Sequence, residues 1–510
     1  MARPGFVLDV DSATPPILFW RGEHLTTEKL PVGSRALYAP EPLPALVDPS
    51  ASISNALITT SHGEPLASLL NAGTKLTIAF DDNSNAVAPT NMLDSRQRVV
   101  ESVLELAAAA GVDDVELIVA RGLNRSMQEG ELRRLLGERV FEAFAPQGSL
   151  NCHDADDDAN LVAVGKTEQG EVVELNGRVA TSDLVVYVGV VTSPNTGGFA
   201  SLATGLTGYR TLKHCASNME SAERIGRVIA EAVDVFHIET TLDNNVFPER
   251  FAFLQRREWE WTTRDKTNYW AYNKFTNVAP PRVARRALSL LASPQAITGI
   301  SAGATDAVHQ ATLERLRQQQ SILVQGQTDI VTIGVPYFSP HTSRSVTNPV
   351  LAAAGGLGYL VPQGSERPVV RAGGVAIIHH PFRREFDPVR HPSYIDFFEQ
   401  LMAETTDAHV LTERFEERFA TDPWYGHLYR TSGSYHGAHP FHVWSSCAKA
   451  IEYLGGVIVV GGDAPTVHRL GFRAATTLQD ALEMARDITG DRDPSLTHLH
   501  APPSLMAGVQ

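Results

Sequence analysis

The sequence has few cysteines, and their spacing suits none of the common cysteine-based sites. The 510 residues include three of them, Cys152, Cys215 and Cys447, and no Cys-x-x-Cys pair. One disulfide at most could form, so neither a disulfide framework nor a structural zinc site or redox dithiol is expected. This usage predicts a protein of a reducing compartment, the cytoplasm.

Positive charge and long hydrophobic runs are also scarce. Lys and Arg total 43 against 58 Asp and Glu, which gives a formal net charge of −15. Nucleic acids and anionic membranes bind clustered cations, so neither partner is expected. The longest apolar runs have about ten residues, well below the ~20 that span a bilayer. The sequence predicts a soluble protein whose partner is a small-molecule substrate, and it leaves homo-oligomerisation open.

Strand-like and helix-like segments alternate in two parts of the chain. The first part has predicted strands at 75–80, 115–120, 184–191 and 235–240 and helices at 96–110, 128–136 and 221–234; the second has strands at 330–335, 374–378 and 456–460 and a helix at 477–489. This alternation predicts two α/β domains with mostly parallel sheets, at 1–278 and 279–490, and an active-site cleft between them. The proline-rich first forty residues are expected to form loops.

Several predicted strands end in polar or glycine-rich turns. Asp81-Asp82 follows the strand at 75–80, Asn124-Arg125 follows the strand at 115–120, and the loop TGGFASLATGLTGYR (196–210) follows the strand at 184–191. Ligands of open parallel sheets bind beyond the carboxyl ends of the strands, so these turns are the predicted site. The glycine-rich loop lets a ligand approach its backbone, yet it contains no lysine.

Each polar turn also has a purely structural interpretation. Asp82 could hold a metal or a substrate hydroxyl, or it could only form an Asx-turn or helix cap. Arg125, next to Asn124, could bind a carboxylate or phosphate with its guanidinium fork, although a surface salt bridge is slightly favoured. The acidic segment Asp154-Ala-Asp-Asp-Asp158 matches no known metal loop, and a solvated turn is favoured there.

Histidines are concentrated in the second half of the chain, and one stands just beyond the glycine-rich loop. His214, beside Cys215, could be a metal ligand, or a half-buried histidine that holds a carbonyl group. His379, His380, His391, His436, His439 and His442 lie in the second domain. Histidines gather where protons or metals are handled, so at least one of these is expected to be functional.

The order of these motifs resembles a known family. The strand ending in FDD is followed by ARGLNRSMQEGEL, by LVVYVGVV and SPNTGGFASLATGLTGYRTLKH, and then by GGVAIIHHPF, HPSYIDFF, HPFHVW and YLGGVIVVGGD. This succession is similar to the lactate racemase family, and closest to its longer branch, described only as lactate racemase domain-containing. The resemblance extends from about residue 70 to the C-terminus.

The resemblance implies a fold and a mechanism. The fold has two α/β domains, with a cofactor in the cleft and a C-terminal tail, here 491–510, that returns to the first domain. The family's cofactor is a nickel-pincer nucleotide whose nickel takes one protein histidine. Its pyridinium accepts a hydride from a 2-hydroxy acid and returns it to either face. The cofactor supplies this chemistry, while the protein orients the substrate and titrates its hydroxyl group.

Some of the family's site residues have counterparts in this chain. Asp82 and Arg125 match residues of the first two strand motifs, and His214 matches the nickel ligand. His391 matches a histidine of the second domain, and Trp444 matches a tryptophan near the cofactor. Gly197, Gly198, Ser201 and Thr204 would hold the cofactor through backbone amides and hydroxyl groups.

Other family residues are replaced. An arginine of the first motif falls on Asn85, and the two catalytic histidines fall on Asn124 and on Pro194 or Asn195. The lysine that tethers the cofactor falls on Ala200 or Thr204, so the cofactor would be held without a covalent bond. None of these replacements can transfer a proton as histidine does, so a histidine of the second domain, such as His439, would have to substitute.

Three functions remain open from the sequence. The first is a racemase or epimerase of a 2-hydroxy acid or sugar acid with a nickel-pincer nucleotide. The second is a different isomerase, lyase or hydrolase on the same scaffold, with another metal or none. The third is a catalytically silent ligand-binding protein. A hydroxy acid would need a cationic clamp, for which Arg125, Arg210, Arg383 and Arg384 are candidates.

Overall fold

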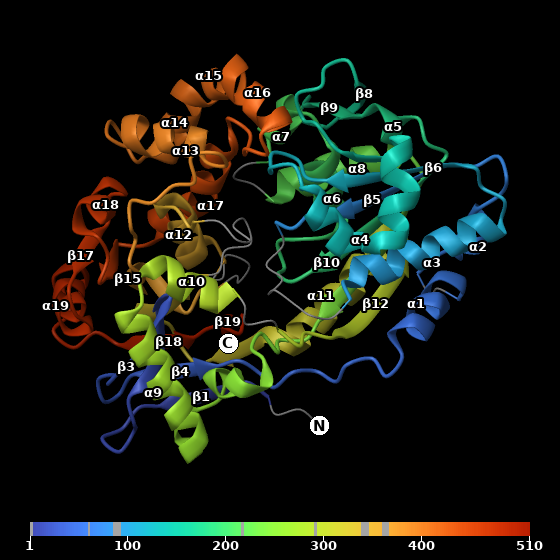
Figure 1. The fold of residues 1–510 in the computed structure, drawn as a ribbon. Helices are drawn as coiled ribbons and strands as arrows, with labels where there is room; N and C mark the ends of the chain where they lie inside the picture. The colour runs from blue at the N-terminus through green and yellow to red at the C-terminus, as the bar shows by residue number, and fades with distance from the viewer. Residues whose placement is uncertain are drawn as a thin grey trace.

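Two β-sheets, each covered by helices, form two lobes that lie side by side (Figure 1). The computed structural model describes residues 4–59, 62–84, 93–215, 219–289, 293–337, 346–359 and 367–510. We call the lobe around the first sheet (residues 49–242 and 297–320) the first lobe. The second lobe is formed by residues 6–38 and 321–509 together with residues 247–288, which pack against residues 18–25. The fold is therefore α/β with mostly parallel strands, as the sequence predicts.

The first sheet contains six strands in the order β12-β11-β10-β5-β6-β7. All neighbours pair in parallel except β11 and β12, which are antiparallel. The strands are β5 (Lys75–Asp81), β6 (Asp114–Ala120), β7 (Leu150–Cys152), β10 (Leu184–Val191), β11 (Val235–Leu242) and β12 (Ile297–Gly303). Every residue of β10 is buried, as expected for a central parallel strand covered on both faces.

Helices cover both faces of the first sheet with separate apolar clusters. One cluster joins α1 (Pro49–Ile58), α3 (Ser95–Ala109) and α4 (Glu129–Phe144) to the strands. The other joins α6 (Gly198–Leu206) and α8 (Met219–Ala232) to the opposite face, beside the hairpin of β8 (Leu161–Lys166) and β9 (Val172–Asn176). α11 (Thr305–Gln320) packs against β11, β12 and α6.

The second sheet has the strand order β1-β4-β18-β14-β15-β16-β17, and β2 and β3 extend from β14. Its strands are β1 (Phe6–Asp9), β2 (Ile17–Gly22), β3 (His24–Glu28), β4 (Arg35–Tyr38), β14 (Thr328–Pro336), β15 (Val370–His379), β16 (Gly456–Val460), β17 (Arg473–Ala475) and β18 (Leu496–His500). Two further strands, β13 (Ser321–Val324) and β19 (Met506–Val509), pair with each other.

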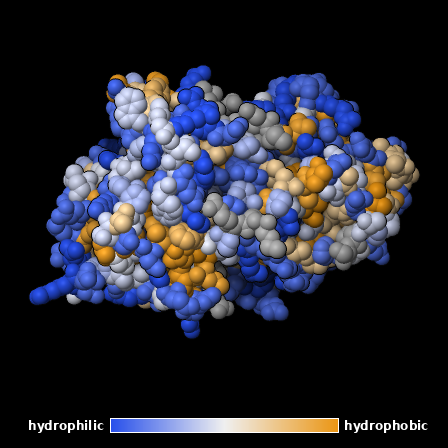
Figure 2. Space-filling view, turned by 90° about the horizontal axis from the view of Figure 1, so that it is seen from below, coloured by the Kyte–Doolittle hydropathy of each residue, from blue (hydrophilic) through white to orange (hydrophobic). Residues whose placement is uncertain are grey.

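The helices of the second lobe include α12 (Pro349–Ala354), α13 (Pro392–Asp396), α14 (Ala408–Leu411), α16 (Pro423–Thr431), α17 (His439–Tyr453), α18 (Ala464–Arg469) and α19 (Leu478–Thr489). The segment between β11 and β12 contains α9 (Thr263–Val278), which is followed by α10 (Pro281–Ser289). Seen from below, the surface is largely hydrophilic, with hydrophobic patches on both halves (Figure 2). Within the described residues, no helix combines the length and the apolar character that crossing a membrane requires.

The division between the lobes differs from the boundary predicted at residue 278. β12 and α11 come after that residue but pack in the first lobe, and the first forty residues form strands of the second sheet rather than loops. In the tail, β18 lies in the second sheet between β4 and β14, so it pairs with residues 35–38 of the predicted first domain in a sheet of the second lobe. Arg35 of β4 and Thr497 of β18 are 462 positions apart, so local sequence carries no sign of their pairing.

Candidate functional site

A pocket of about 120 Å³ lies at the carboxyl ends of β5, β6 and β10, beside the first turn of α6. Five predicted site residues line it: Asp82, Asn124, Gly197, Ser201 and Thr204. A larger open cavity of about 580 Å³ lies at the opposite edge of the sheet, and no predicted site residue lines it. The described residues that line the smaller pocket come from the first lobe, and the second lobe contacts Asn124 among them.

Asp82 is a buried carboxyl group directly after β5. Ser84 donates hydrogen bonds to it from its hydroxyl group and from its backbone N–H (2.8 Å), which makes the Asx-turn considered above. Burial raises the pKa of Asp82 to about 6; the bonds from Ser84 oppose this rise, and the nearby charge of Asp81 adds to it. A carboxyl group with this pKa can accept and donate protons near neutral pH.

Asn124 connects the pocket to the second lobe. Its Oδ1 accepts a hydrogen bond of 2.9 Å from Nε2 of His439, the first residue of α17. Nδ1 of His439 accepts a bond of 2.7 Å from the hydroxyl of Tyr394, so the ring is held in one orientation from both sides. The structure thus brings together two candidate site residues, Asn124 and His439, from different lobes.

The four candidate arginines are each paired with a carboxylate. Arg125 forms a two-pronged pair with Glu131 (2.6 and 2.7 Å), which is the salt-bridge alternative rather than an open clamp. The others pair as follows: Arg210 with Glu174 (3.0 Å) and Asp158 (2.7 Å), Arg383 with Glu23 (2.6 Å), and Arg384 with Glu399. None of these four charges is therefore uncompensated and directed at a substrate carboxylate in this conformation.

The glycine turn before α6 has a different role from the predicted cofactor cradle. The backbone N–H of Gly198 donates to Oε1 of Glu239 at 2.6 Å, and this carboxylate is fully buried. Both glycines have positive φ values, +96° at Gly197 and +56° at Gly198. A Cβ at Gly197 would lie 2.5 Å from Glu239 Oε1, so the glycines make room for an internal carboxylate. The amide of Gly198 is therefore not available to a phosphate group.

Ser201 and Thr204 present hydroxyl groups on α6 to the pocket. Ser201 donates to the carbonyl of Gly198 (2.7 Å), and Thr204 donates to the carbonyl of Ala200 (2.8 Å). Their donor hydrogens are thus used inside the helix, while their oxygen atoms can still accept a bond from a ligand. Ala200, the other position aligned with the family's lysine, also lines the pocket.

Six predicted residues do not line the pocket: Arg125, Gly198 and His439, which are described above, and His214, His391 and Trp444. The His214 side chain is 36% exposed and faces Glu171 at 3.7 Å. His391 is buried, and its Nδ1 accepts from the backbone N–H of Asp387 (3.3 Å). Trp444 is a core residue that donates to the carbonyl of Thr406 (2.8 Å). The described part of the chain contains no group of three or more His, Cys, Asp or Glu side chains that could bind a metal.

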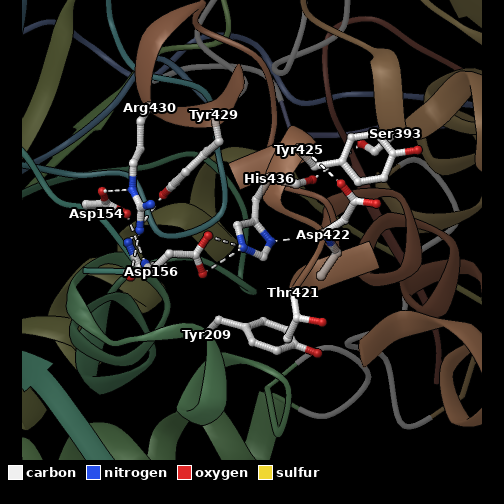
Figure 3. A network of polar contacts seen from close by, with 12 residues as sticks. Asp154, Asp156, Tyr209, Ser393, Thr421, Asp422, Tyr425, Tyr429, Arg430 and His436 are labelled. Atoms are coloured by element: carbon white, nitrogen blue, oxygen red, sulfur yellow. Dashed lines mark hydrogen bonds and ion pairs between the residues drawn. The ribbon is translucent and has the colours of Figure 1, made fainter. Parts of the chain in front are cut away.

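The acidic segment after β7 connects the lobes, which corrects its prediction as a solvated turn (Figure 3). Arg430 of α16 donates to Asp154 (2.8 Å) and to the carbonyl of Asp156 (2.7 Å). His436 accepts from the N–H of Ala438 at Nδ1, so its Nε2 carries the proton that it donates to Asp156 (2.9 Å). Sequence spacing gave no sign of these contacts, because the partners lie 276 and 280 positions apart.

The loop between β6 and α4 is held by the same part of the second lobe. The hydroxyl of Tyr429 donates to the carbonyl of Gly122 at 2.7 Å, and the backbone N–H of His436 donates to the carbonyl of Leu123 at 3.1 Å. The guanidinium of Arg121 lies 3.9 Å above the ring of Tyr429. The second lobe therefore fixes the backbone that carries Asn124 into the pocket.

Known proteins resemble this chain in sequence over one region and in fold over its whole length. Residues 24–226 match the lactate racemase N-terminal domain family. No curated protein matches the sequence. The solved lactate racemase apoprotein from Thermoanaerobacterium thermosaccharolyticum is 15% identical, covers 97% of this chain and 100% of its own, and gives a TM-score of 0.62.

A protein of Thermotoga maritima is 12% identical and covers 91% of this chain and 97% of its own, but its TM-score of 0.45 is too low to carry an argument. At such identities the likeness to solved structures concerns the fold alone. The resemblance noted in the sequence is confirmed to this extent: residues 24–226 match the lactate racemase N-terminal domain family, and the fold of the whole chain is similar to that of the lactate racemase apoprotein.

Proposed function

We propose that this protein is a racemase-like isomerase that acts on a small 2-hydroxy acid or sugar acid in the pocket at the ends of β5, β6 and β10. The observation that carries the proposal is the carboxyl group of Asp82. It lies in that pocket with a pKa of about 6, beside an amide that His439 holds in place. A titratable group of this kind in a polar pocket of a racemase-like fold is suited to proton transfer.

Each residue of the pocket has a role in the proposal. Asp82 exchanges a proton with the hydroxyl group of the substrate. Asn124 donates a hydrogen bond from its amide, since its Oδ1 is already engaged by His439. Ser201 and Thr204 accept hydrogen bonds from further hydroxyl groups, which suits a sugar acid. Closure of the second lobe over the loop at 121–124 limits the access of water.

The described residues do not fit the nickel-pincer nucleotide of the family. The pocket, at about 120 Å³, is smaller than the ~300 Å³ at which ligand pockets of this kind begin. Asp81 and Asp82 place two carboxyl groups in its lining, which contains no lysine or histidine among the described residues. The nearby amide of Gly198 is occupied by Glu239, and His214 faces Glu171. We therefore derive no step through nickel. Asn85, at the position of the family's arginine in the first motif, lies outside the described residues.

A second candidate is a metal-independent isomerase or lyase on the same fold. The specific observation in its favour is again Asp82, because a carboxyl group with a pKa near 6 is a proton-transfer group without any metal. The two candidates place the substrate in the same pocket. They differ in whether catalysis also requires bound nickel, for which the pocket would have to open beyond the volume given above.

One experiment separates these functions. The full chain is expressed with and without the enzymes that make the pincer nucleotide, and its metal content, visible absorbance and turnover of enantiopure hydroxy acids are measured. Inversion of an enantiomer supports the proposed isomerase, and near-stoichiometric nickel would show that the pocket opens to admit the nucleotide. Turnover without nickel favours the second candidate. Absence of turnover across the panel in both preparations refutes both and leaves a ligand-binding protein.

A further inference from the structure

A histidine–carboxylate pair lies behind the glycine turn and has no role in the function described so far. Glu239 is on β11, and its side chain is fully buried. Its carboxylate accepts from the N–H of Gly198 at 2.6 Å, and Nδ1 of His309 on α11 lies 3.1 and 3.2 Å from its two oxygens. Because a carboxylate only accepts, Nδ1 of His309 carries a proton, and its Nε2 is left as a proton acceptor when the ring is neutral.

The environment keeps Glu239 ionised. Burial by itself would raise the pKa of Glu239, but the bond from His309, the nearby His237 and the N–H of Gly198 together hold it below its ordinary value. His237 approaches Glu239 at 3.5 Å and is completely buried. Burial lowers the pKa of His237 to about 4, so this ring stays neutral and packs on Tyr187. Of these two histidines, His309 is the one whose ring is hydrogen-bonded to Glu239.

The ring of His309 lies against the turn that lines the pocket. A Cβ at Gly197 would lie 3.0 Å from its Cε1, and a Cβ at Gly198 would lie 2.7 Å from its Cδ2. Nε2 is bonded to both of these ring atoms. Gly197 also lines the pocket, together with Asn195 and Thr196. One residue without a side chain therefore separates His309 from the pocket.

The remaining ring nitrogen of His309 is open. The side chain is 18% exposed, and Nε2 makes no hydrogen bond with the described residues. The other charged pair nearby on α11, Asp306 with Arg227 (3.7 Å), lies on the exposed surface. An imidazole that is fixed at Nδ1 by a buried carboxylate and open at Nε2 has the arrangement of a general base oriented by a third group.

We propose that His309, oriented by Glu239, is a second proton-transfer residue of this pocket, acting at the end formed by Asn195–Gly197. The inference rests on the proposed function. In the step, the O–H bond of a bound hydroxy acid breaks and an N–H bond forms at Nε2. The alkoxide left on the substrate faces an imidazolium whose charge Glu239 balances, and the reverse step returns the proton. His309 would then act beside Asp82 as the second proton-transfer residue of the pocket.

The test compares His309→Gln and Glu239→Gln with His409→Gln. His409 also faces a glutamate, Glu452 at 3.4 Å, but this pair is on the surface and the histidine is 78% exposed. The full-length protein is labelled with ¹⁵N-histidine, and its imidazole signals are followed during additions of D- and L-lactate. The imidazole signal that is missing from the spectrum of His309→Gln identifies His309 in the wild type. In the wild type this signal should show the Nδ1–H tautomer and should shift when lactate is added. In Glu239→Gln the same ring should no longer be held in that tautomer.

Kinetics provide the second readout. We expect kcat/KM to fall by ~10²–10⁴ in His309→Gln, with lactate binding retained and one limb of the pH profile lost, and to be unchanged in His409→Gln. Activity of His309→Gln within twofold of the wild type would overturn the inference while leaving the proposed isomerase intact. A lactate-dependent shift of His309 without any turnover would refute the isomerase but support the contact. Neither binding nor turnover in the wild type would refute both.

Discussion

Replacing Asp82 by asparagine should make the protein more stable at neutral pH while it lowers activity. The reason is the cost of ionising a buried carboxyl group. The pKa of Asp82 is raised from an ordinary 3.8 to about 6, so between these values the folded protein binds a proton that the unfolded chain has lost. At ~1.4 kcal/mol per pH unit, this group costs the folded state up to about 3 kcal/mol at pH 7.5. Asparagine keeps a carbonyl oxygen for the bonds from Ser84 and carries no charge.

The pH dependence has a definite sign. Below pH 3.8 the carboxyl group of Asp82 is protonated in both the folded and the unfolded state, so the folded protein bears no ionisation cost. As the pH rises through 6, this group ionises in the folded protein and the free energy of unfolding falls. The wild type and Asp82→Asn should therefore have similar free energies of unfolding near pH 3.8. The variant should be more stable by about 1–3 kcal/mol at pH 7.5. Chemical denaturation at four pH values, followed by far-UV circular dichroism, measures this difference.

The exposed Asp493 provides a matched control. Asp493→Asn should change the free energy of unfolding by less than about 0.5 kcal/mol relative to the wild type at any pH. Loss of stability in Asp82→Asn at pH 7.5 would refute the reasoning, because it would mean that the carboxylate is stabilised rather than penalised by its surroundings. A difference that does not vary with pH would refute the assignment of the raised pKa to this residue.

Three further substitutions test the surroundings of the pocket. Gly198→Ala should destabilise the protein by about 3 kcal/mol or more, because its Cβ would lie 2.7 Å from the His309 ring. The control Gly148→Ala is also at positive φ but has open space around it, so it should cost only about 1 kcal/mol. Equal losses of stability in thermal denaturation would argue against the close contact with His309. Tyr429→Phe removes the hydroxyl bond to Gly122 and should cost about 0.5–1.5 kcal/mol in denaturant titrations, and a neutral result would mean that this bond does not hold the loop. His439→Ala removes the bonds to Asn124 and Tyr394, so kcat/KM for a hydroxy acid should fall at least tenfold; full activity would exclude His439 from positioning Asn124.

The sequence was sufficient for the elements that carry the pocket. Continuous apolar runs predicted β5, β6 and β10, and the residues after them predicted an edge at which Asp82, Asn124 and the segment 196–210 would meet. That segment was expected to be a loop, but most of it forms the helix α6. Parallel strands deliver their carboxyl ends to one edge, so local patterns decide such a site once the topology is parallel. The same reasoning could not assign the first forty residues, whose strands have partners at the other end of the chain.

The candidate residues divide in the same way. The identity of His214 and Trp444 matched a family pattern, but their positions depend on packing, and the structure turns His214 toward Glu171 and buries Trp444 in the core. His309 and Glu239 have no motif that would single them out. They lie 70 positions apart, and only the packing of α11 against β11 brings them together behind Gly198.

The sequence by itself therefore determined the α/β class, the strand-end turns and the absence of a lysine from the glycine-rich loop, because these follow from composition and spacing along the chain. The tertiary structure decided which charges are paired, which carboxyl group has a raised pKa and which histidine stands next to the pocket. Pairing and desolvation depend on distances of a few ångströms between residues that are far apart in the sequence, and chain order alone does not contain those distances.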